Sequence, residues 1–275
     1  MRKILVTTDL SENSKSGIHF AIQLASQLNC DLTFLHLYFI SKPAYMTDIA
    51  FTEYEKEESQ KLLDRFTDFV HDTFKSADIT PRNISLILKC SFLTDSAIAE
   101  YATTGGFDYI CIATHGAGKV RKILGTTTSY LIANSNVPVI VVPGNYKPVP
   151  ITSILYASDL RNVEKELCRV KEFAEPLQST IMLLHFTSPL DKLLDTKTLE
   201  KVQSTFPEVN VLLEDVSPIE TLLSNLETTI EKTKPSLLVM FTDQDRSLFE
   251  RIFLSSNSAE FSFAPKLPLL VFKKI

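Results

Sequence analysis

The chain has 275 residues and a net charge of −5, with 44% hydrophobic and 22% charged residues. This balance is that of an ordinary globular protein and excludes a disordered, coiled-coil or collagen-like chain. At ~150 residues per domain the length predicts two domains or one large one. The negative charge excludes an overall basic field for nucleic acid, and no apolar run approaches the ~18 residues of a membrane span. We therefore expect neither nucleic acid nor a membrane as a partner.

The N-terminus and the cysteines predict a cytoplasmic protein. The chain starts with Met1, Arg2 and Lys3 but reaches polar Thr7 and acidic Asp9 too soon for a signal peptide. None of the four cysteines is part of a C-x-x-C pair, so a disulfide framework is not expected.

Short apolar runs alternate with amphipathic stretches along the first half. The runs, rich in Ile, Val and Leu as strands buried on both faces are, cover residues 4–7, 32–39, 84–88, 109–113 and 137–142. Helical patterns between them centre on residues 18–28, 62–70, 98–101 and 131–133. Thr94 and Asp95 are expected to cap the third helix. Alternating strands and helices predict βαβ units and a parallel sheet, with five strands and four helices per half.

The second half repeats the first in the same order. The segment ILVTTDL at 4–10 returns as ILYASDL at 154–160, and PVIVV at 138–142 returns as PLLVF at 268–272. This predicts a duplicated domain, with boundaries 1–144 and 150–275 and a short extended linker between them. We expect the halves to pack as a pseudo-two-fold pair in which the final strands meet and cover each other's edges.

Two loops follow strands where parallel sheets bind ligands, at residues 7–11 and 113–127. The second holds three glycines and three basic residues and then enters a helix. Free N–H groups and a positive dipole end there are the parts of a phosphate site. The alternative is a surface loop in which the glycines only turn the chain and Thr126 or Thr127 caps the helix. The loop matches neither the dinucleotide fingerprint nor a Walker loop.

The chain resembles a tandem universal stress protein. The resemblance rests on the first strand running into Asp9, on the pair Leu35-His36 and on the segment SNVPVIVVP at 135–143, and it covers both halves. It implies an α/β fold of two repeated Rossmann-like domains, each a five-stranded parallel sheet flanked by about four helices. Nucleotide-binding members carry Gly-x2-Gly-x9-Gly-Ser/Thr after the fourth strand. The resemblance thus implies a cytoplasmic stress-response protein that binds ATP or another adenine nucleotide as a regulatory ligand, with Mg²⁺ as a companion of the nucleotide.

The resemblance also implies the site residues, all in the first half. Asp9 would contact adenosine and Leu37 the adenine, although Asp9 could instead cap a helix that begins near Asn13, and Leu37 could be core. The cofactor-binding set is Thr7, Thr8, Asp9, Leu37, Ala113, His115, Gly116, Gly125, Thr126 and Thr127.

The loop departs from the family motif at two places. Ala113 stands where the first glycine belongs, and eight residues rather than nine separate Gly116 from Gly125. We take Gly125 as the third motif glycine, because Gly125-Thr126 preserves the Gly-Ser/Thr pair. With the spacing of nine, Thr126 would replace that glycine.

The second half lacks the motif altogether. Gln244 and Ser255 stand in place of Gly116 and Gly125, and three acids lie where phosphates would bind. We therefore expect one nucleotide site per chain. His36 and His185 recur at equivalent positions of both halves, which favours a role in the fold over one in catalysis.

The sequence shows no catalytic arrangement of nucleophile and base and no metal-ligand spacing. We therefore expect a binding protein and no enzyme, with weak ATP hydrolysis left open. The alternative is an interaction protein of the same fold that binds no nucleotide and acts through partner surfaces. The expected partners are an adenine nucleotide and, within the chain, the other half of the pseudo-dimer, which could pair further into a homodimer.

Overall fold

The computed structural model describes residues 2–77, 83–114, 125–188, 191–215, 221–242 and 267–274. In the first half the elements are β1 (Lys3–Thr7), α1 (Lys15–Leu28), β2 (Asp31–Tyr38), α2 (Asp48–Ser76), β3 (Ile84–Cys90), α3 (Thr94–Thr104), β4 (Tyr109–Ala113), α4 (Thr126–Asn134) and β5 (Val139–Val142). In the second they are β6 (Ser153–Ala157), α5 (Val163–Ala174), β7 (Thr180–Thr187), α6 (Lys192–Thr205), β8 (Asn210–Asp215), α7 (Leu222–Thr233), β9 (Leu237–Thr242) and β10 (Leu269–Lys273). Two single 3-10 turns, Glu12–Ser14 and Glu175–Leu177, adjoin α1 and α5.

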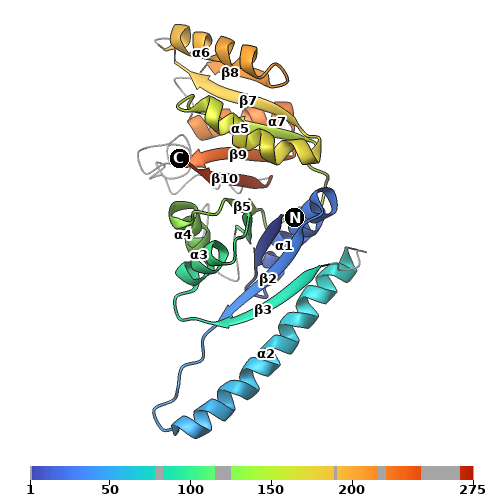
Figure 1. Cartoon of the computed structure of the whole chain (residues 1–275), viewed down its shortest axis with the longest axis vertical. Coiled ribbons are helices and arrows are strands. Elements are labelled where there is room, and N and C mark those ends of the chain that lie inside the picture. The colour runs from blue at the N-terminus through green and yellow to red at the C-terminus, as the bar shows by residue number, and fades with distance from the viewer. Residues whose placement is uncertain are drawn as a thin grey trace.

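All ten strands form one sheet in the order β3-β2-β1-β4-β5-β10-β9-β6-β7-β8 (Figure 1). The strands of each half are parallel, and the second half repeats the strand order of the first in reverse across the centre. The α/β class and the parallel sheet within each half are thus confirmed. The domain boundaries 1–144 and 150–275 stay a prediction, and the fourth helix expected in the second half falls outside the described residues.

The two halves join through their last strands. β5 and β10 pair in antiparallel fashion, with Val139, Ile140 and Val141 opposite Val271, Leu270 and Leu269. This confirms that the two edge strands meet. Each strand covers backbone N–H and C=O groups that would otherwise form an open edge. The two five-stranded sheets thereby become one continuous layer.

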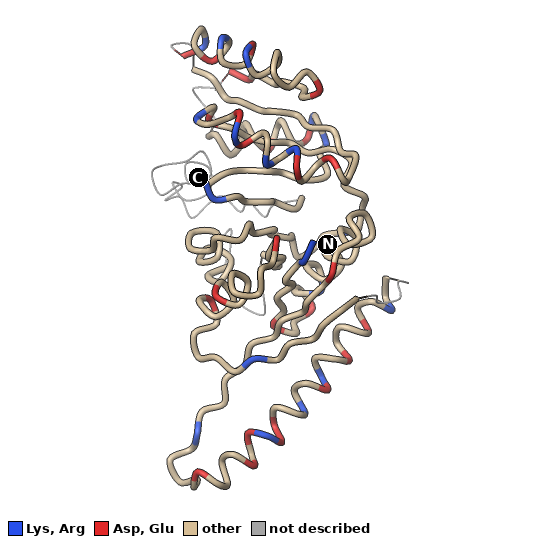
Figure 2. Tube along the Cα trace, viewed as in Figure 1, with Lys and Arg blue, Asp and Glu red and all other residues tan. Residues whose placement is uncertain are grey.

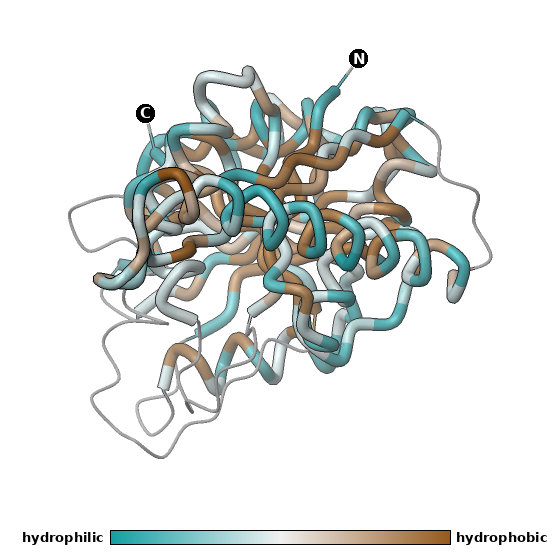
Figure 3. The backbone as a smooth tube through the Cα atoms, turned by 90° about the horizontal axis from the view of Figure 1, so that it is seen from below, coloured by the Kyte–Doolittle hydropathy of each residue, from teal (hydrophilic) through white to brown (hydrophobic). Residues whose placement is uncertain are grey.

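Two hydrophobic clusters cover the two faces of this layer, and each extends across both halves. The helices α1, α2, α5 and α6 pack on one face, and α3, α4 and α7 pack on the other. Apolar residues gather in the strands at the centre, with polar residues toward the outside (Figure 3). Charged residues occur mainly on helices and turns (Figure 2). Because both faces of the sheet are covered, its strands consist of nearly continuous apolar residues, as their sequences indicate.

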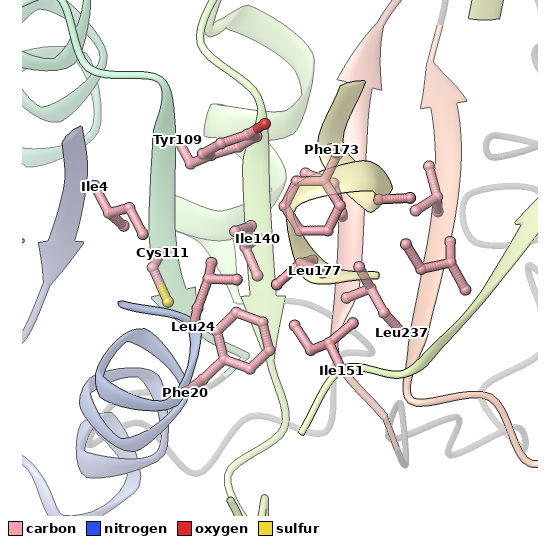
Figure 4. Packing of buried hydrophobic residues seen from close by; sticks show 14 of the residues in the cluster. Ile4, Phe20, Leu24, Tyr109, Cys111, Ile140, Ile151, Phe173, Leu177 and Leu237 are labelled. Atoms are coloured by element: carbon pink, nitrogen blue, oxygen red, sulfur yellow. The ribbon is translucent and has the colours of Figure 1, made fainter. Parts of the chain in front are cut away.

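Side chains from both halves interlock beside the central strands (Figure 4). The rings of Tyr109 and Phe173 pack edge to face with their centroids 5.4 Å apart. The Gln27 side chain on α1 donates to the carbonyl of Ile151 and accepts from the N–H of the same residue, at 3.2 and 2.9 Å. These contacts tie α1 and β4 of the first half to the start of the second.

Helix α2 is much longer than its apolar pattern predicts. It begins at Asp48, where the Thr47 hydroxyl caps it by accepting from the Ala50 N–H, and its first half extends away from the body of the protein (Figure 1). No residue from 48 to 65 is buried. Exposed ion pairs within the helix, such as Lys61 with Glu57 and Glu58 at 2.8 and 3.0 Å, lie where the apolar stripe is missing.

We expect the pairing of β5 with β10 to make the ten-stranded sheet unfold cooperatively, in a single transition. Leu270 is fully buried in β10, so Leu270→Ala should lower the free energy of unfolding by about 2–5 kcal/mol through the cavity it leaves. The control Val149→Ala removes a 46% exposed side chain and should change it by less than about 0.5 kcal/mol. Urea denaturation followed by circular dichroism measures both. Two separate transitions, only one of them shifted by Leu270→Ala, would contradict the expectation.

Candidate functional site

The candidate site lies at the carboxyl ends of β1, β2 and β4. Strand order reverses between β1 and β4, because β2 continues the sheet on one side of β1 and β4 on the other. The loops that leave such neighbouring strands diverge to opposite faces and leave a crevice at the sheet edge. Residues 7–9 and residues 113–114 therefore lie at the carboxyl ends of the two strands between which the order reverses.

The loop after β1 is held in a fixed turn. The buried Thr8 hydroxyl accepts from the Leu10 N–H at 3.0 Å and shares a hydrogen bond of 2.8 Å with the Ser14 hydroxyl. Leu10 has a φ of +61°, in the left-handed region that residues other than glycine rarely adopt. Thr7 ends β1 and is also buried, so neither threonine presents its side chain openly to solvent.

Asp9 is the exposed member of this turn. Its Oδ1 accepts from the Ser11 N–H at 3.0 Å and from the Ser11 hydroxyl at 2.6 Å, which closes a local Asx turn. The cap of the following 3-10 turn is Ser11, and the cap position of α1 is Ser14. The alternative interpretation of Asp9 as the cap of that helix is therefore wrong.

The repeated histidines serve the fold. His36 Nδ1 donates to the Thr8 carbonyl at 2.8 Å, and His185 Nδ1 donates to the Ser158 carbonyl at the same distance. Each links the carboxyl end of the second strand of its half to the end of the first. Burial lowers the pKa of His36, which keeps the ring neutral at neutral pH. Leu37 is half-buried and packs against the cluster on the α3 and α4 face, so its side chain belongs to the core.

The two residues that flank the loop after β4, Thr114 and Gly125, are hydrogen-bonded to each other. The Gly125 N–H donates to the Thr114 carbonyl at 3.0 Å, and a Cβ on Gly125 would lie 3.0 Å from that same oxygen. A side chain at this position would therefore make a tight contact unless the backbone shifted by a few tenths of an ångström. Ala113 is buried, and the Thr128 hydroxyl contacts its carbonyl at 3.4 Å. His115 and Gly116 lie outside the described residues.

Helix α4 starts without a side-chain cap. Its cap position is Gly125, so the expectation that Thr126 or Thr127 caps the helix is wrong. Thr126 is exposed, whereas the Thr127 hydroxyl donates to Asp95 Oδ1 at 2.6 Å. Thr94 and Asp95 do not cap α3 either, because the cap position there is Leu93. The first N–H groups of α4 have no intrahelical acceptor, as at every helix start.

The equivalent position of the second half is filled by the protein itself. Asp159 matches Asp9, and the ammonium of Lys274 lies 2.9 and 2.7 Å from its two carboxylate oxygens. Both side chains are nearly buried, at 7% exposed for Lys274 and 14% for Asp159. Lys274 lies two residues beyond Phe272 of β10, where the first half has Gly144 two residues beyond Val142 of β5.

Two further buried groups surround this ion pair. Glu166 lies 3.7 Å from the Lys274 ammonium and accepts from the Tyr156 hydroxyl. Burial raises the pKa of Glu166, and burial together with Glu166 raises the pKa of Tyr156 well above its ordinary value. Sequence reasoning missed this network. Its only signal was a lysine at the position that matches Gly144.

Two negative findings apply to the described part of the chain. There, no three His, Cys, Asp or Glu side chains come together in a group that could hold a metal ion. No helix in those same ranges combines the length and the apolar character needed to cross a membrane. Cys111 is buried in β4, and burial raises the pKa of its thiol.

Breaking the internal ion pair should destabilise the protein. Lys274→Met leaves the Asp159 carboxylate without its buried partner and should lower the free energy of unfolding by about 3–5 kcal/mol. The matched control is Lys192→Met, which removes an exposed ion pair with Asp215 and should cost about 0–1 kcal/mol. Equal losses in urea denaturation would show that the Lys274 pair is not a buried one in solution.

The comparisons with known proteins agree with this architecture. The profile of the Universal stress protein family matches residues 1–143. A universal stress protein from Archaeoglobus fulgidus DSM 4304 is 19% identical with a TM-score of 0.69, over 98% of both chains. A protein of unknown function from Pseudomonas aeruginosa PAO1 is 16% identical with a TM-score of 0.59, over 99% of this chain and 92% of its own.

A universal stress protein solved in complex with cAMP covers 51% of this chain and 96% of its own, at 19% identity and a TM-score of 0.38. No curated protein sequence matches the chain. The family profile matches more than half of the chain, and the fold of the Archaeoglobus fulgidus protein is similar over nearly all of it. The chain belongs to the universal stress protein family.

Proposed function

We propose that the first half binds one adenine nucleotide as a regulatory ligand and that the protein acts in a cytoplasmic stress response. The observation that carries the proposal is the reversal of strand order between β1 and β4, because sheets of this kind bind ligands at the carboxyl ends of the strands where the order reverses. The Asp9 turn follows β1 there, and the hydrogen bond from the Gly125 N–H to the Thr114 carbonyl holds the start of α4 beside the end of β4. Family membership supports the same assignment, because the nucleotide motif of the family begins after the fourth strand.

The polar groups at the ends of β1 and β4 suit a nucleoside phosphate. The exposed Asp9 carboxylate can accept hydrogen bonds from ribose hydroxyls, and the free N–H groups at the start of α4 can donate to phosphate oxygens. In this proposal the backbone of Thr7, Thr8 and Leu37 borders the adenosine, and Ala113, His115, Gly116, Gly125, Thr126 and Thr127 surround the phosphates. Mg²⁺ would enter with the nucleotide.

Two features of the second half support a single site per chain. The Lys274 ammonium neutralises Asp159 and fills the place beside it. The segment equivalent to the phosphate loop has Gln244 in place of Gly116 and adds negative charge at Asp243 and Asp245. A phosphate would meet bulk and repulsion there. An interaction protein that binds no nucleotide is the alternative, and the binding experiment decides between them.

We expect one bound nucleotide per chain and a strict dependence on Asp9. Asp9→Ala should weaken ATP or AMP binding about ten- to a hundred-fold, because it removes a charged hydrogen-bond acceptor. The control is Asp159→Asn at the equivalent position of the second half, which weakens the Lys274 ion pair and lowers stability but should leave the affinity of the folded protein unchanged. Isothermal titration calorimetry gives stoichiometry and affinity together.

The same titration contains the contrary outcomes. Two sites per chain, or equal losses in the two variants, would show that the ligand is placed in the wrong half. No heat at millimolar ATP, with the nucleotide absent from heat-released extracts of the purified protein, would support the interaction protein instead.

We expect ATP turnover to be slow or absent. Binding without selective stabilisation of a transition state does not accelerate hydrolysis, and the carboxylate that the structure places at the start of α4, Asp95, already accepts a hydrogen bond from Thr127. Phosphate release from labelled ATP measures this directly. Steady release that Asp9→Ala or His115→Ala abolishes would show that the protein is an enzyme.

A further inference from the structure

Asp95 links the starts of two helices. It is the second residue of α3, it is half-buried, and its Oδ1 accepts from the hydroxyl of Thr127, the second residue of α4, at 2.6 Å. Neither helix has a side-chain cap, since the cap positions are Leu93 and Gly125. The carboxylate therefore lies at the positive end of α4 while it also belongs to the first turn of α3.

This position places a fixed negative charge beside the proposed phosphate site. Phosphates bind at a helix start because the N–H groups and the dipole attract anions. Asp95 already provides an anion at the start of α4, held there by the Thr127 hydroxyl. Two anions at one helix end repel, and the repulsion grows with the charge of the second.

We propose that Asp95 selects the bound nucleotide by the charge of its phosphate chain. The inference rests on the proposed nucleotide site and names its preferred class of ligand. An adenine nucleotide with one phosphate is accepted, whereas metal-free ATP is disfavoured by its extra negative charges. Mg²⁺ lowers the charge of the triphosphate and so removes most of the discrimination.

A purely structural Asp95 would behave differently. If it only joined α3 to α4, its loss would loosen the start of α4 and weaken every nucleotide alike. The measured quantity is therefore the ratio of two affinities, that for metal-free ATP and that for AMP. This ratio is insensitive to a general loosening of the site.

The test compares Asp95→Asn with the unchanged protein in calorimetric titrations of AMP, of ATP in EDTA and of ATP with Mg²⁺. The Asn side-chain oxygen can still accept from Thr127, so the helix contact is kept while the charge is removed. We expect affinity for metal-free ATP to rise about tenfold relative to AMP, and much less when Mg²⁺ is present. The control Glu100→Gln removes the same charge from an exposed position further along α3 and should leave the ratio unchanged. Asp95→Ser is the second neutral variant should Asp95→Asn unfold.

If Asp95→Asn left the ratio of the two affinities unchanged, or if Glu100→Gln raised it equally, the proposed role of Asp95 would be wrong. The proposed nucleotide site would not be affected by that result. Failure of the unchanged protein to bind AMP or ATP under any of the three conditions would defeat the site itself, and the selection with it.

Discussion

The antiparallel pairing of β5 with β10 is the interaction on which the rest of the structure depends. It turns two five-stranded sheets into one layer and leaves open edges, among the ten described strands, only at β3 and β8. Because the sheet is continuous, each hydrophobic cluster extends across both halves. That pairing also brings side chains of the two halves together. Tyr109 packs against Phe173, and the Arg2 guanidinium donates a hydrogen bond of 2.5 Å to the Glu172 carbonyl.

Joining both halves in one chain allows them to differ. In a dimer of identical subunits, any substitution that fills one site fills the other as well. Here the second half keeps the acid at the end of its first strand but uses it inside the fold, because Lys274 neutralises Asp159. The first half has Gly144 at the matching position, with Asn13 as the neighbour of any side chain placed there. One architecture thus has an exposed acid at the end of β1 in one half and a buried ionic network in the other.

The strands could be predicted from the sequence to within about three residues, because burial on both faces makes each an apolar run bounded by polar residues. The same argument found α1, α3 and α4 but not the start of α2, since no residue from 48 to 61 is buried and this part of the helix carries no apolar stripe. The contacts of Asp95 and Lys274 were also missed. Each joins residues 32 or 115 positions apart in the chain, and only the packing of elements brings such residues together.

The left-handed turn at Leu10 recurs at Leu160, where φ is +63°. A left-handed conformation costs a leucine about 1–2 kcal/mol, and glycine would adopt it without that cost. A glycine, however, would give this hinge a wide range of backbone angles in the unbound protein. With leucine, two contacts restrict the turn to one conformation. The Leu10 N–H donates to the Thr8 hydroxyl, and the Leu10 side chain packs in the hydrophobic cluster. The acid that precedes it is consequently held in one direction, so that in the proposed site little orientational entropy would be lost when a ligand bound.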